Sequence, residues 1–319
     1  MRIILLLKIL LVISVVTNIG LGIFLFVRER PVKTEEIQLY PYLSKRIFVE
    51  AQNDILINFT PLREAMNEHV PKMDVLVGVY FEYLPSGSSI GVNEKMQVKI
   101  ASLIKIPIVM AVYKEIEKGS LSKDSVLTVT KERLDPTYGS LWKKGEGTQI
   151  TVWEAINLAL IESDNTATNV LISILPEDAL ERVYNWLDVP KNKEGDSPIL
   201  SPKNYTSILR SLYLSSYLTE ASSNEILEIL TRTIFTDMLP AGVPSEIKVA
   251  HKIGVFRPLG AASTDQVFSD CGIIYVPNRP YALCIMVRGD EEHAREYMKF
   301  ISKMVYGFMV KTNTKNNGS

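Results

Sequence analysis

Ser102 and Lys105 have the residue types and the spacing of a serine nucleophile with a neighbouring base. In a helix that begins at residue 101 or 102, side chains three positions apart lie on one face, about 5–6 Å from each other. A serine hydroxyl is a weak nucleophile unless a base is beside it. A lysine acts as that base only when burial or a nearby cation lowers its pKa. The residues around Lys105 are apolar, so we expect its amine to be buried.

The Ser-x-x-Lys spacing is a weak signal alone, because it occurs four times, at Ser102, Ser120, Ser140 and Ser245. The last three follow a glycine or a proline in turn-like sequence, whereas Ser102 opens an apolar run. An acylation site also needs a proton path to the leaving group, a group that holds the substrate and an oxyanion hole. The assignment of Ser102 as a nucleophile therefore depends on whether other parts of the chain supply these groups.

Two other short patterns supply groups of these kinds. Residues 163–165, Ser-Asp-Asn, offer a hydroxyl and a carboxamide between two predicted helices. Residues 252–254, Lys-Ile-Gly, lie in a predicted strand, where a glycine lets another backbone approach closely. The three patterns thus occur at a helix start, in a break between helices and on a strand.

The periodicity of apolar residues predicts the elements that must position these groups. Strands are predicted at residues 74–83, 89–93, 247–256, 267–276 and 281–287, and helices at 61–70, 102–118, 152–161, 166–174, 177–187, 202–217, 225–233 and 291–306. This order predicts an α+β fold, with an antiparallel five-stranded sheet flanked by terminal helices. An all-helical lobe is inserted at about residues 119–240.

The N-terminal region has the length and composition of a membrane anchor. The 19 residues 9–27 carry no charged side chain, and as a helix they reach about 28 Å, close to the ~30 Å hydrocarbon core of a bilayer. The alternative is a cleaved signal peptide, but the apolar run passes straight into charged residues. We expect a single-pass transmembrane helix within residues 1–30, a linker and extension at 31–72, an exported domain at 73–310 and a polar tail at 311–319.

The balance of charges and the few histidines and cysteines limit the binding partners and cofactors that we expect. With 35 Lys and Arg against 36 Asp and Glu, we expect no nucleic-acid partner. The three histidines are far apart, so no metal site is expected, and no pattern suggests a cofactor. Cys271 and Cys284 lie in the last two predicted strands, where a hairpin would place them on one side but on a diagonal. A disulfide is one reading, and two buried free thiols are the favoured one.

With the three patterns in this order, the chain resembles the class A β-lactamases and the penicillin-binding serine acyltransferases related to them. The resemblance covers residues 77–306. It includes Ala-Ser-Leu-Ile-Lys at 101–105, Glu-Ser-Asp-Asn-Thr-Ala-Thr-Asn at 162–169, Ala-His-Lys-Ile-Gly at 250–254 and Asp-Cys-Gly-Ile-Ile-Tyr at 270–275. It implies the serine β-lactamase fold and an acyl-enzyme mechanism.

The resemblance implies a role for residues of each pattern. Ser102 is implied to be the acylated nucleophile, Lys105 its general base or pKa partner, and Ser163 the relay of a proton to the leaving nitrogen. Asn165 would hold the amide side chain of the substrate, and Lys252 would supply positive charge near the substrate carboxylate.

The resemblance also implies an oxyanion hole formed by the backbone N–H groups of Ser102 and Val255. Gly254 is a candidate for substrate binding because a glycine in a strand lets a substrate backbone approach closely. Tyr138 is a candidate for the rim of the cleft because it lies in a polar loop, with packing as the alternative.

Ile253 departs from the pattern of the family. That position usually carries threonine or serine, whose hydroxyl contacts the substrate carboxylate. Isoleucine therefore weakens carboxylate binding in the usual mode of the family. Arg257 lies nearby in the sequence and is a candidate to compensate, the alternative being a surface arginine.

A second departure concerns the water that releases the acyl group. Class A enzymes have a Glu-x-x-Leu-Asn loop whose glutamate activates this water, and no such motif occurs between residues 169 and 252. Where that loop is expected, the acidic residues are Asp188, Glu194 and Asp196. Glu194 is the candidate, and a solvated loop charge is the alternative. Because acylation and deacylation are separate steps, we expect acylation by β-lactams with slow release.

The resemblance implies a serine hydrolase, and the uncharged N-terminal run predicts that it is anchored in the bacterial cell membrane with its catalytic domain on the extracytoplasmic side. Its substrate would be a β-lactam or a D-Ala-D-Ala peptidoglycan stem, reacting through an acyl-enzyme on Ser102. Two alternatives stay open: a penicillin-binding D,D-peptidase, and a non-catalytic module that binds cell wall or senses β-lactams. The complete acylation set argues against the second alternative.

Overall fold

The computed structural model describes residues 14–18, 41–42, 57–195, 197–258, 260 and 265–314. Residues 14–18 are helical, and the rest of the predicted anchor lies outside the described residues, as does most of the predicted linker. No described helix combines the length and hydropathy needed to cross a bilayer. The chain divides into two units, Met1–Leu39 and Tyr40–Ser319, and all elements named below belong to the second.

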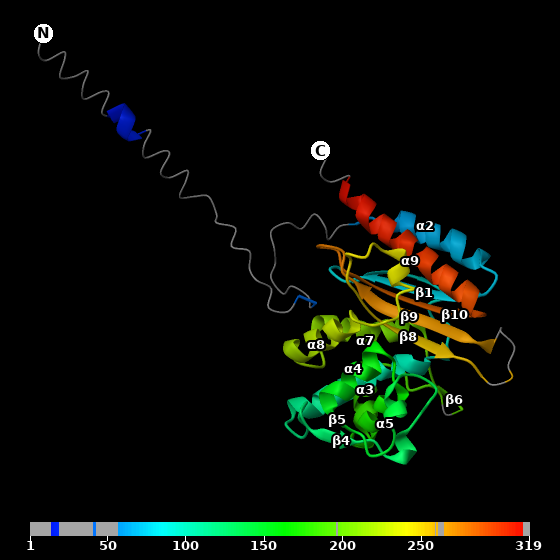
Figure 1. The fold of residues 1–319 in the computed structure, drawn as a ribbon. Helices are drawn as coiled ribbons and strands as arrows, with labels where there is room; N and C mark the ends of the chain where they lie inside the picture. Colours follow the sequence, from blue (N-terminus) through cyan, green and yellow to red (C-terminus); the bar gives the residue numbers. More distant parts are fainter. Residues whose placement is uncertain are drawn as a thin grey trace, which may run out of the picture. The chain divides into compact units, whose positions relative to one another are not determined.

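A five-stranded antiparallel sheet forms the centre of this second unit, in the order β2-β1-β10-β9-β8 (Figure 1). The strands are β1 (Leu76–Tyr83), β2 (Ser88–Val92), β8 (Val249–Phe256), β9 (Val267–Ile274) and β10 (Tyr281–Arg288). The central strands β1, β10 and β9 are buried along nearly their whole length, because helices cover both faces of the sheet. The predicted antiparallel sheet of five strands is confirmed.

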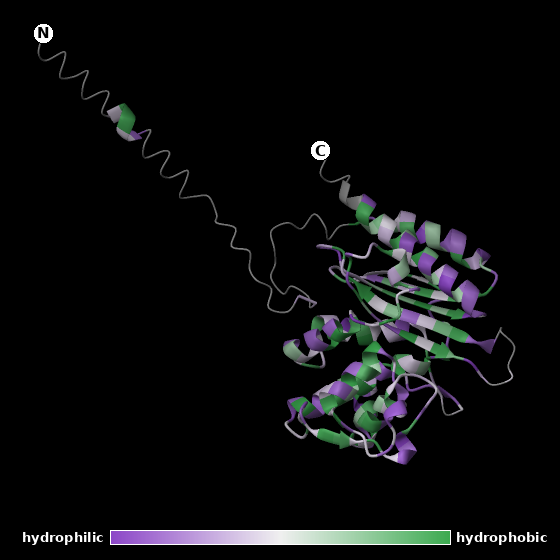
Figure 2. Ribbon diagram, viewed as in Figure 1, coloured by the Kyte–Doolittle hydropathy of each residue, from purple (hydrophilic) through white to green (hydrophobic). Residues whose placement is uncertain are grey.

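The two terminal helices, α2 (Thr60–His69) and α9 (Glu291–Thr314), lie together on one face of the sheet (Figure 1). Met66 and Met298 of these helices pack with Phe81 and Ile285 of the strands in one buried cluster. In Figure 2 the strands are largely hydrophobic, whereas α9 shows many hydrophilic residues. Successive side chains of a strand point to opposite faces of the sheet. The strands therefore contribute side chains both to this cluster and to a second cluster on the opposite face.

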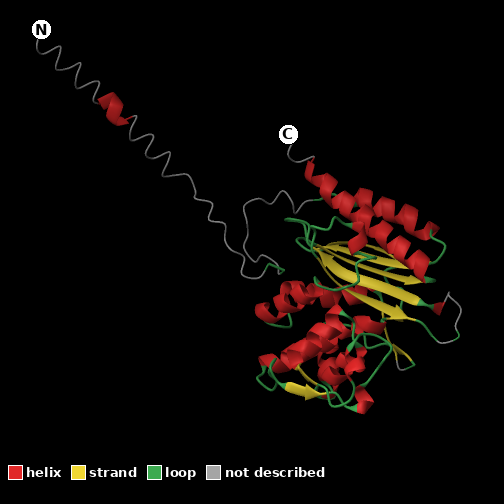
Figure 3. Cartoon of the chain, viewed as in Figure 1, coloured by secondary structure: helices red, strands yellow, loops and turns green. Residues whose placement is uncertain are grey.

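Six helices form the lobe on the opposite face (Figure 3). They are α3 (Lys105–Glu117), α4 (Val152–Ile161), α5 (Asn165–Ser173), α6 (Ala179–Trp186), α7 (Pro202–Leu214) and α8 (Glu220–Leu230). The 3-10 turns of the lobe are η3 (Ala101–Ile104), η4 (Lys131–Arg133) and η5 (Leu141–Lys144). Two further 3-10 turns, η2 (Val70–Lys72) and η6 (Pro240–Gly242), lie outside the lobe. Thr151 caps α4 and forms a capping box with Glu154. α8 begins five residues before its predicted start because Thr219 caps it there.

Short strand pairs complete the lobe. β4 (Val126–Thr128) pairs with β5 (Gln149–Thr151), and β7 (Ser197–Leu200) pairs with both β3 (Val98–Lys99) and β6 (Lys193–Glu194). The polar composition of residues 188–200 predicts a loop, and β6 and β7 lie within this segment. β7 therefore lies between β6, which carries Glu194, and β3, which leads into Ser102.

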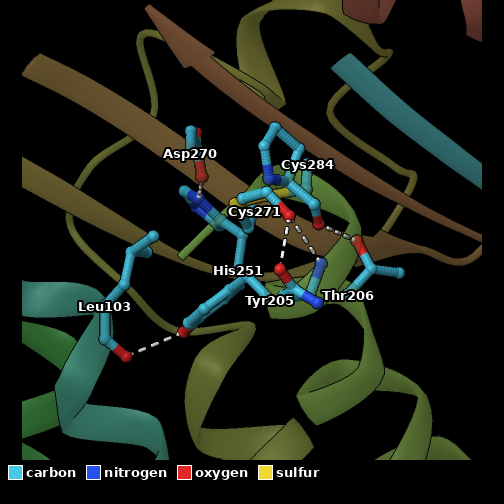
Figure 4. Close-up of a disulfide and its surroundings, with 10 residues drawn as sticks. Leu103, Tyr205, Thr206, His251, Asp270, Cys271 and Cys284 are labelled. Carbon is cyan, nitrogen blue, oxygen red and sulfur yellow. Dashed lines mark hydrogen bonds and ion pairs between the residues drawn. A yellow bond between two sulfur atoms is a disulfide. The ribbon is translucent and has the colours of Figure 1, made fainter. Parts of the chain in front are cut away.

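Cys271 and Cys284 form a disulfide, so the favoured prediction of two free thiols is wrong (Figure 4). The placement on a diagonal is also wrong, because the register pairs Cys284 directly with Cys271. The sequence predicted that the first strand of this hairpin runs to residue 276, but β9 ends at Ile274, opposite Tyr281. That difference shifts the register and brings the two side chains together on the face of the sheet that meets the lobe.

Candidate active site

Ser102 lies in a 3-10 turn rather than in an α-helix. The turn η3 ends at Ile104, and α3 begins at Lys105. Because residues three positions apart are eclipsed in a 3-10 helix, Lys105 lies directly over Ser102, with its Nζ 3.1 Å from the Oγ. Ala101, before the serine, has a φ of 44°. That left-handed conformation costs a non-glycine residue about 1–3 kcal/mol and is concentrated at functional sites.

Four oxygen atoms surround the amine of Lys105. Its Nζ lies 2.5 Å from the carbonyl oxygen of Ser163, 2.7 Å from Asn165 Oδ1, and 3.1 Å from the hydroxyls of both Ser102 and Ser163. The two carbonyl-type oxygens are acceptors only, so each takes an N–H from the amine. A neutral amine has two N–H groups, and its lone pair is then left for the hydroxyls. The arrangement suits Lys105 as the acceptor of a proton from either serine.

Burial favours the neutral form of this amine. Lys105 is 3% exposed, and desolvation lowers its pKa to about 8. The carboxylates of Asp164 and Asp135 act in the opposite direction and keep the pKa from falling further. Near pH 8, about half of the Lys105 amines are therefore able to accept a proton.

The buried carboxylate of Asp164 holds the backbone next to Ser163. Asp164 is the N-cap of α5, and its Oδ1 accepts the N–H of Ala167 at 2.8 Å. Its Oδ2 accepts the backbone N–H groups of Ser140 and Leu141, both at 2.7 Å. Ser163 has a φ of 58°, a second strained position at the site. Three hydrogen bonds to a fully buried carboxylate thus stabilise the segment that carries this strain.

The polar loop before η5 packs closely against Asn165. The backbone N–H of Asn165 donates to the carbonyl of Tyr138 at 3.1 Å, and its Nδ2 donates to Asp135 Oδ2 at 3.3 Å. Gly139 has a φ of 93°, and a Cβ there would lie 2.2 Å from Asp164 Oδ2. Only glycine fits this position. The loop therefore fixes the Asn165 carboxamide, whose oxygen faces Lys105.

Strand β8 reaches Ser102 because Gly254 has no side chain. A Cβ at Gly254 would lie 2.6 Å from the carbonyl oxygen of Ile100. Tyr205 of α7 donates its hydroxyl to the carbonyl of Leu103 at 2.8 Å, so η3 is held between β8 and α7 (Figure 4). Val255 follows Gly254 on β8, which is an edge strand. Every second N–H and C=O of an edge strand faces away from the sheet and is free to bind a ligand.

Lys252 lies on β8 with its amine fully buried. Its Nζ donates to the carbonyl of Ile253 at 3.3 Å and lies 5.6 Å from the centre of the Phe235 ring. Desolvation lowers the pKa of Lys252 well below its usual range, and the charge of Lys105 lowers it further, whereas Asp270 raises it. The amines of Lys105 and Lys252 therefore belong to one electrostatic site.

A model of the beta-lactamase enzyme family matches residues 61–309. The chain belongs to this family. A beta-lactamase of Phocaeicola vulgatus is 22% identical over 256 residues, which are 72% of this chain and 78% of that protein. Beta-lactamase VEB-1 of Pseudomonas aeruginosa is 25% identical over 209 residues, 59% of this chain and 68% of that protein. The solved structure of PBP-A is 26% identical with a TM-score of 0.70, covering 79% of this chain and 97% of that chain.

A second structure of PBP-A, a mutant described as an acyl-enzyme complex with penicillin G, is 27% identical and also has a TM-score of 0.70. It covers 79% of this chain and 97% of that chain. These relatives share the α+β fold and the serine hydrolase family of β-lactamase type. Among the described residues of the chain, no group of three or more His, Cys, Asp or Glu side chains is placed to hold a metal ion.

Two candidate residues of this β-lactamase-family chain form ion pairs elsewhere. Glu194 of β6 lies 3.3 Å from Lys99 Nζ, and its side chain is 62% exposed. Arg257 pairs with Glu291 of α9. Each charge is thus balanced by a partner at the surface, which favours the surface-charge alternative for both residues.

Sequence reasoning missed three residues that build the site. Asp164 carried a usable signal, because an aspartate directly before an apolar helix is a favoured N-cap. Tyr205 and Phe235 carried none, because each contacts the site only through tertiary packing. Tyr138, named as a rim residue, is 40% exposed, and its ring lies 5.9 Å from that of Phe235.

Proposed function

We propose that this chain is a membrane-anchored, extracytoplasmic serine hydrolase of the class A β-lactamase type that β-lactams acylate at Ser102. The observation that carries the proposal is the Lys105 amine, 3.1 Å from the hydroxyls of both Ser102 and Ser163. Its pKa of about 8 makes this amine a usable base near neutral pH. The same contacts give a nucleophile, a base and a relay in one chain of groups.

Acylation follows from this chain of groups. Ser102 Oγ attacks the lactam carbonyl while its proton passes to Lys105 Nζ. The C–N bond of the lactam then breaks, and the leaving nitrogen takes a proton from the Ser163 hydroxyl, which Lys105 reprotonates. Because Lys105 contacts both hydroxyls, no group has to move far.

Backbone groups would stabilise the charge on the lactam oxygen. We assign this role to the N–H groups of Ser102 and Val255, since η3 and edge strand β8 meet at Gly254. Backbone donors that are already in place stabilise a developing oxyanion without reorganisation. The carboxamide of Asn165 would bind the amide side chain of the substrate. Its Nδ2 would then exchange the long contact with Asp135 for one with the substrate.

Release of the acyl group is proposed to be slow. Deacylation needs a water activated by a base, and the acid that sequence suggested for this task, Glu194, is an exposed partner of Lys99. Asp135 accepts hydrogen bonds from Thr137 and Asn165, which outweigh the effect of burial and keep its pKa below the ordinary value. Such a carboxylate is a poor base near neutral pH.

A penicillin-binding D,D-peptidase acting on peptidoglycan stems is the second candidate function. The position of Glu194 favours it, because a peptidase that transfers its acyl group to an amine does not need a fast hydrolytic step. The similarity to PBP-A also supports it. The two functions share acylation at Ser102 and differ in the fate of the acyl group.

The proposed location rests on residues 9–27 and on the disulfide. As a helix, this uncharged run has about the length of the hydrocarbon core of a bilayer. The bond between Cys271 and Cys284 suits an oxidising compartment outside the cytoplasm. Both observations support a bacterial membrane anchor with the catalytic domain on the outer side.

Intact-mass spectrometry of the chain with benzylpenicillin tests the proposal. We expect a mass gain of one penicilloyl group that persists for about an hour or longer after excess drug is removed, because neither Glu194 nor Asp135 is suited to activate the hydrolytic water. A gain that decays within seconds would show an efficient β-lactamase with another deacylation base. The absence of any gain in folded protein would favour the non-catalytic module instead.

A further inference from the structure

The carboxylate of Asp135 lies beside the group that is proposed to bind the side-chain amide of the substrate. Its Oδ2 is 3.3 Å from Nδ2 of Asn165. A hydrogen bond to that Nδ2 is about 2.9 Å long, so a substrate oxygen bound there lies at most about 6 Å from the carboxylate. Asp135 is partly exposed. The acyl side chain of a bound substrate therefore lies next to this carboxylate.

The backbone of Asp135 is fixed to the helix that carries Asn165. Its N–H donates to Thr166 Oγ1 at 2.9 Å, and its carbonyl accepts the hydroxyl of Thr166 at 3.2 Å. Thr166 is fully buried in the first turn of α5. Asn169 of the same helix donates its Nδ2 to the carbonyl of Arg133 at 3.2 Å. Since one helix holds both groups, the carboxylate and the carboxamide are preorganised relative to each other.

Asp135 carries a negative charge that uncharged donors stabilise. Its Oδ1 accepts the backbone N–H of Thr137 at 2.8 Å, and in the described part of the chain Asp135 forms no ion pair. Partial burial raises the pKa of Asp135, but the hydrogen bonds from Thr137 and Asn165 and the charge of Lys105 together lower it below its ordinary value. The side chain is therefore ionised near neutral pH.

Two other carboxylates near Asn165 have donors that the substrate does not compete for. Asp164 is fully buried and accepts three backbone N–H groups. Glu162 Oε2 accepts the hydroxyl of Ser140 at 2.6 Å. Of these three carboxylates, Asp135 is the one whose donor is the substrate-binding carboxamide itself.

Substrate binding therefore leaves Asp135 short of a partner. When Asn165 Nδ2 turns to the substrate amide, the Oδ2 of Asp135 loses that donor, and the bound ligand displaces water from it. A charged oxygen that loses both solvent and donor is costly. An ammonium group on the substrate replaces the lost donor with a charge-assisted hydrogen bond.

We infer that Asp135 is a specificity-determining residue that selects acyl donors with an ammonium group next to the side-chain amide. The inference rests on the proposed acylation of Ser102 and on the proposed binding of that amide by Asn165. An ammonium on the carbon beside the amide carbonyl is within reach of the Asp135 carboxylate. A neutral substituent at the same carbon leaves the charge of Asp135 uncompensated.

The test compares three penicillins that differ at this one carbon. Ampicillin carries an ammonium there, α-hydroxybenzylpenicillin a neutral hydroxyl of similar size, and benzylpenicillin only hydrogen. Second-order rates of mass gain are measured at about pH 6.5, where an α-amine is protonated. We expect ampicillin to acylate the wild-type chain about 3–10-fold faster than the hydroxyl compound, as a partly exposed ion pair would give.

Asp135→Asn removes the charge and keeps an oxygen that accepts the N–H of Thr137. It is expected to reduce the ratio of the ampicillin rate to the hydroxyl-compound rate to about one. Glu132→Gln is the matched control, because it removes an exposed carboxylate from η4, three residues before Asp135. This control is expected to keep the wild-type ratio within about twofold.

A wild-type ratio of one or less would overturn the inference, and this measurement needs no variant. A ratio that survives in folded Asp135→Asn would also overturn it. So would an equal loss in Glu132→Gln, because the effect would then belong to the charge of the whole loop. Acylation by none of the three penicillins would overturn the proposed function itself, so the two failures give different results.

Discussion

Replacing Lys105 by methionine is expected to slow the acylation of Ser102 by benzylpenicillin by about 10²–10⁴-fold. Methionine has a similar volume, so the buried site stays filled. The substitution removes the amine that contacts both serine hydroxyls. The carbonyl oxygen of Ser163 and Asn165 Oδ1 lose their donor, which is expected to lower the stability by about 1–3 kcal/mol for each without preventing folding. The rate of mass gain under single-turnover conditions is the measurement.

The pH dependence of the same rate checks the role of Lys105. Because the neutral amine is the base and its pKa is about 8, acylation of the wild type should rise with pH and level off above about pH 8. The Lys105→Met variant should lose this inflection. Lys114→Met, on the exposed side of α3 in an ion pair with Glu117, is the control and should keep both rate and profile. An unchanged inflection in Lys105→Met would rule out Lys105 as the titrating base.

Replacing Asp164 by alanine is expected to lower the free energy of unfolding by about 3–5 kcal/mol. The change leaves the backbone N–H groups of Ser140, Leu141 and Ala167 without their acceptor in a fully buried setting. It also releases the left-handed conformation of Ser163. Urea unfolding followed by circular dichroism measures the change.

The control for this variant is Asp178→Ala. Asp178 also precedes a helix, but its side chain caps no N–H and is 59% exposed in an ion pair with Arg182. Its loss should cost about 1 kcal/mol or less. Equal effects of the two substitutions would mean that Asp164 is an ordinary helix cap and does not organise the site.

The sheet and most helices could be predicted because their sequence patterns reflect burial directly. α4 was predicted at its observed bounds, because the apolar periodicity over residues 152–161 coincides with the helix and Thr151 before it is a favoured N-cap residue. Residues 193–200 were harder, because β6 and β7 are short and gain their pairing from β3, far away in the sequence. The register of Cys271 and Cys284 depended on where β9 ends, which apolar periodicity does not resolve.

Within the site, the predicted groups Ser102, Lys105, Ser163 and Asn165 meet at one amine. The sequence predicted that an α-helix begins at Ser102. In the structure this residue lies in a 3-10 turn, and Ala101 before it has a strained backbone conformation. Local propensity does not predict such strain, because it is maintained by contacts with distant elements. For the same reason, no local pattern indicated the contact between Phe235 and Lys252.

Peptide mapping of the chain after reaction with benzylpenicillin locates the acyl group directly. We expect the modification on Ser102 alone, with no mass gain in Ser102→Ala and an unchanged gain in Ser120→Ala, a serine that shares the Ser-x-x-Lys spacing but hydrogen-bonds to Glu115. The reason is that Ser102, unlike Ser120, has a buried amine of lowered pKa beside its hydroxyl. A penicilloyl group on any other serine, or a full gain in Ser102→Ala, would contradict the proposed mechanism.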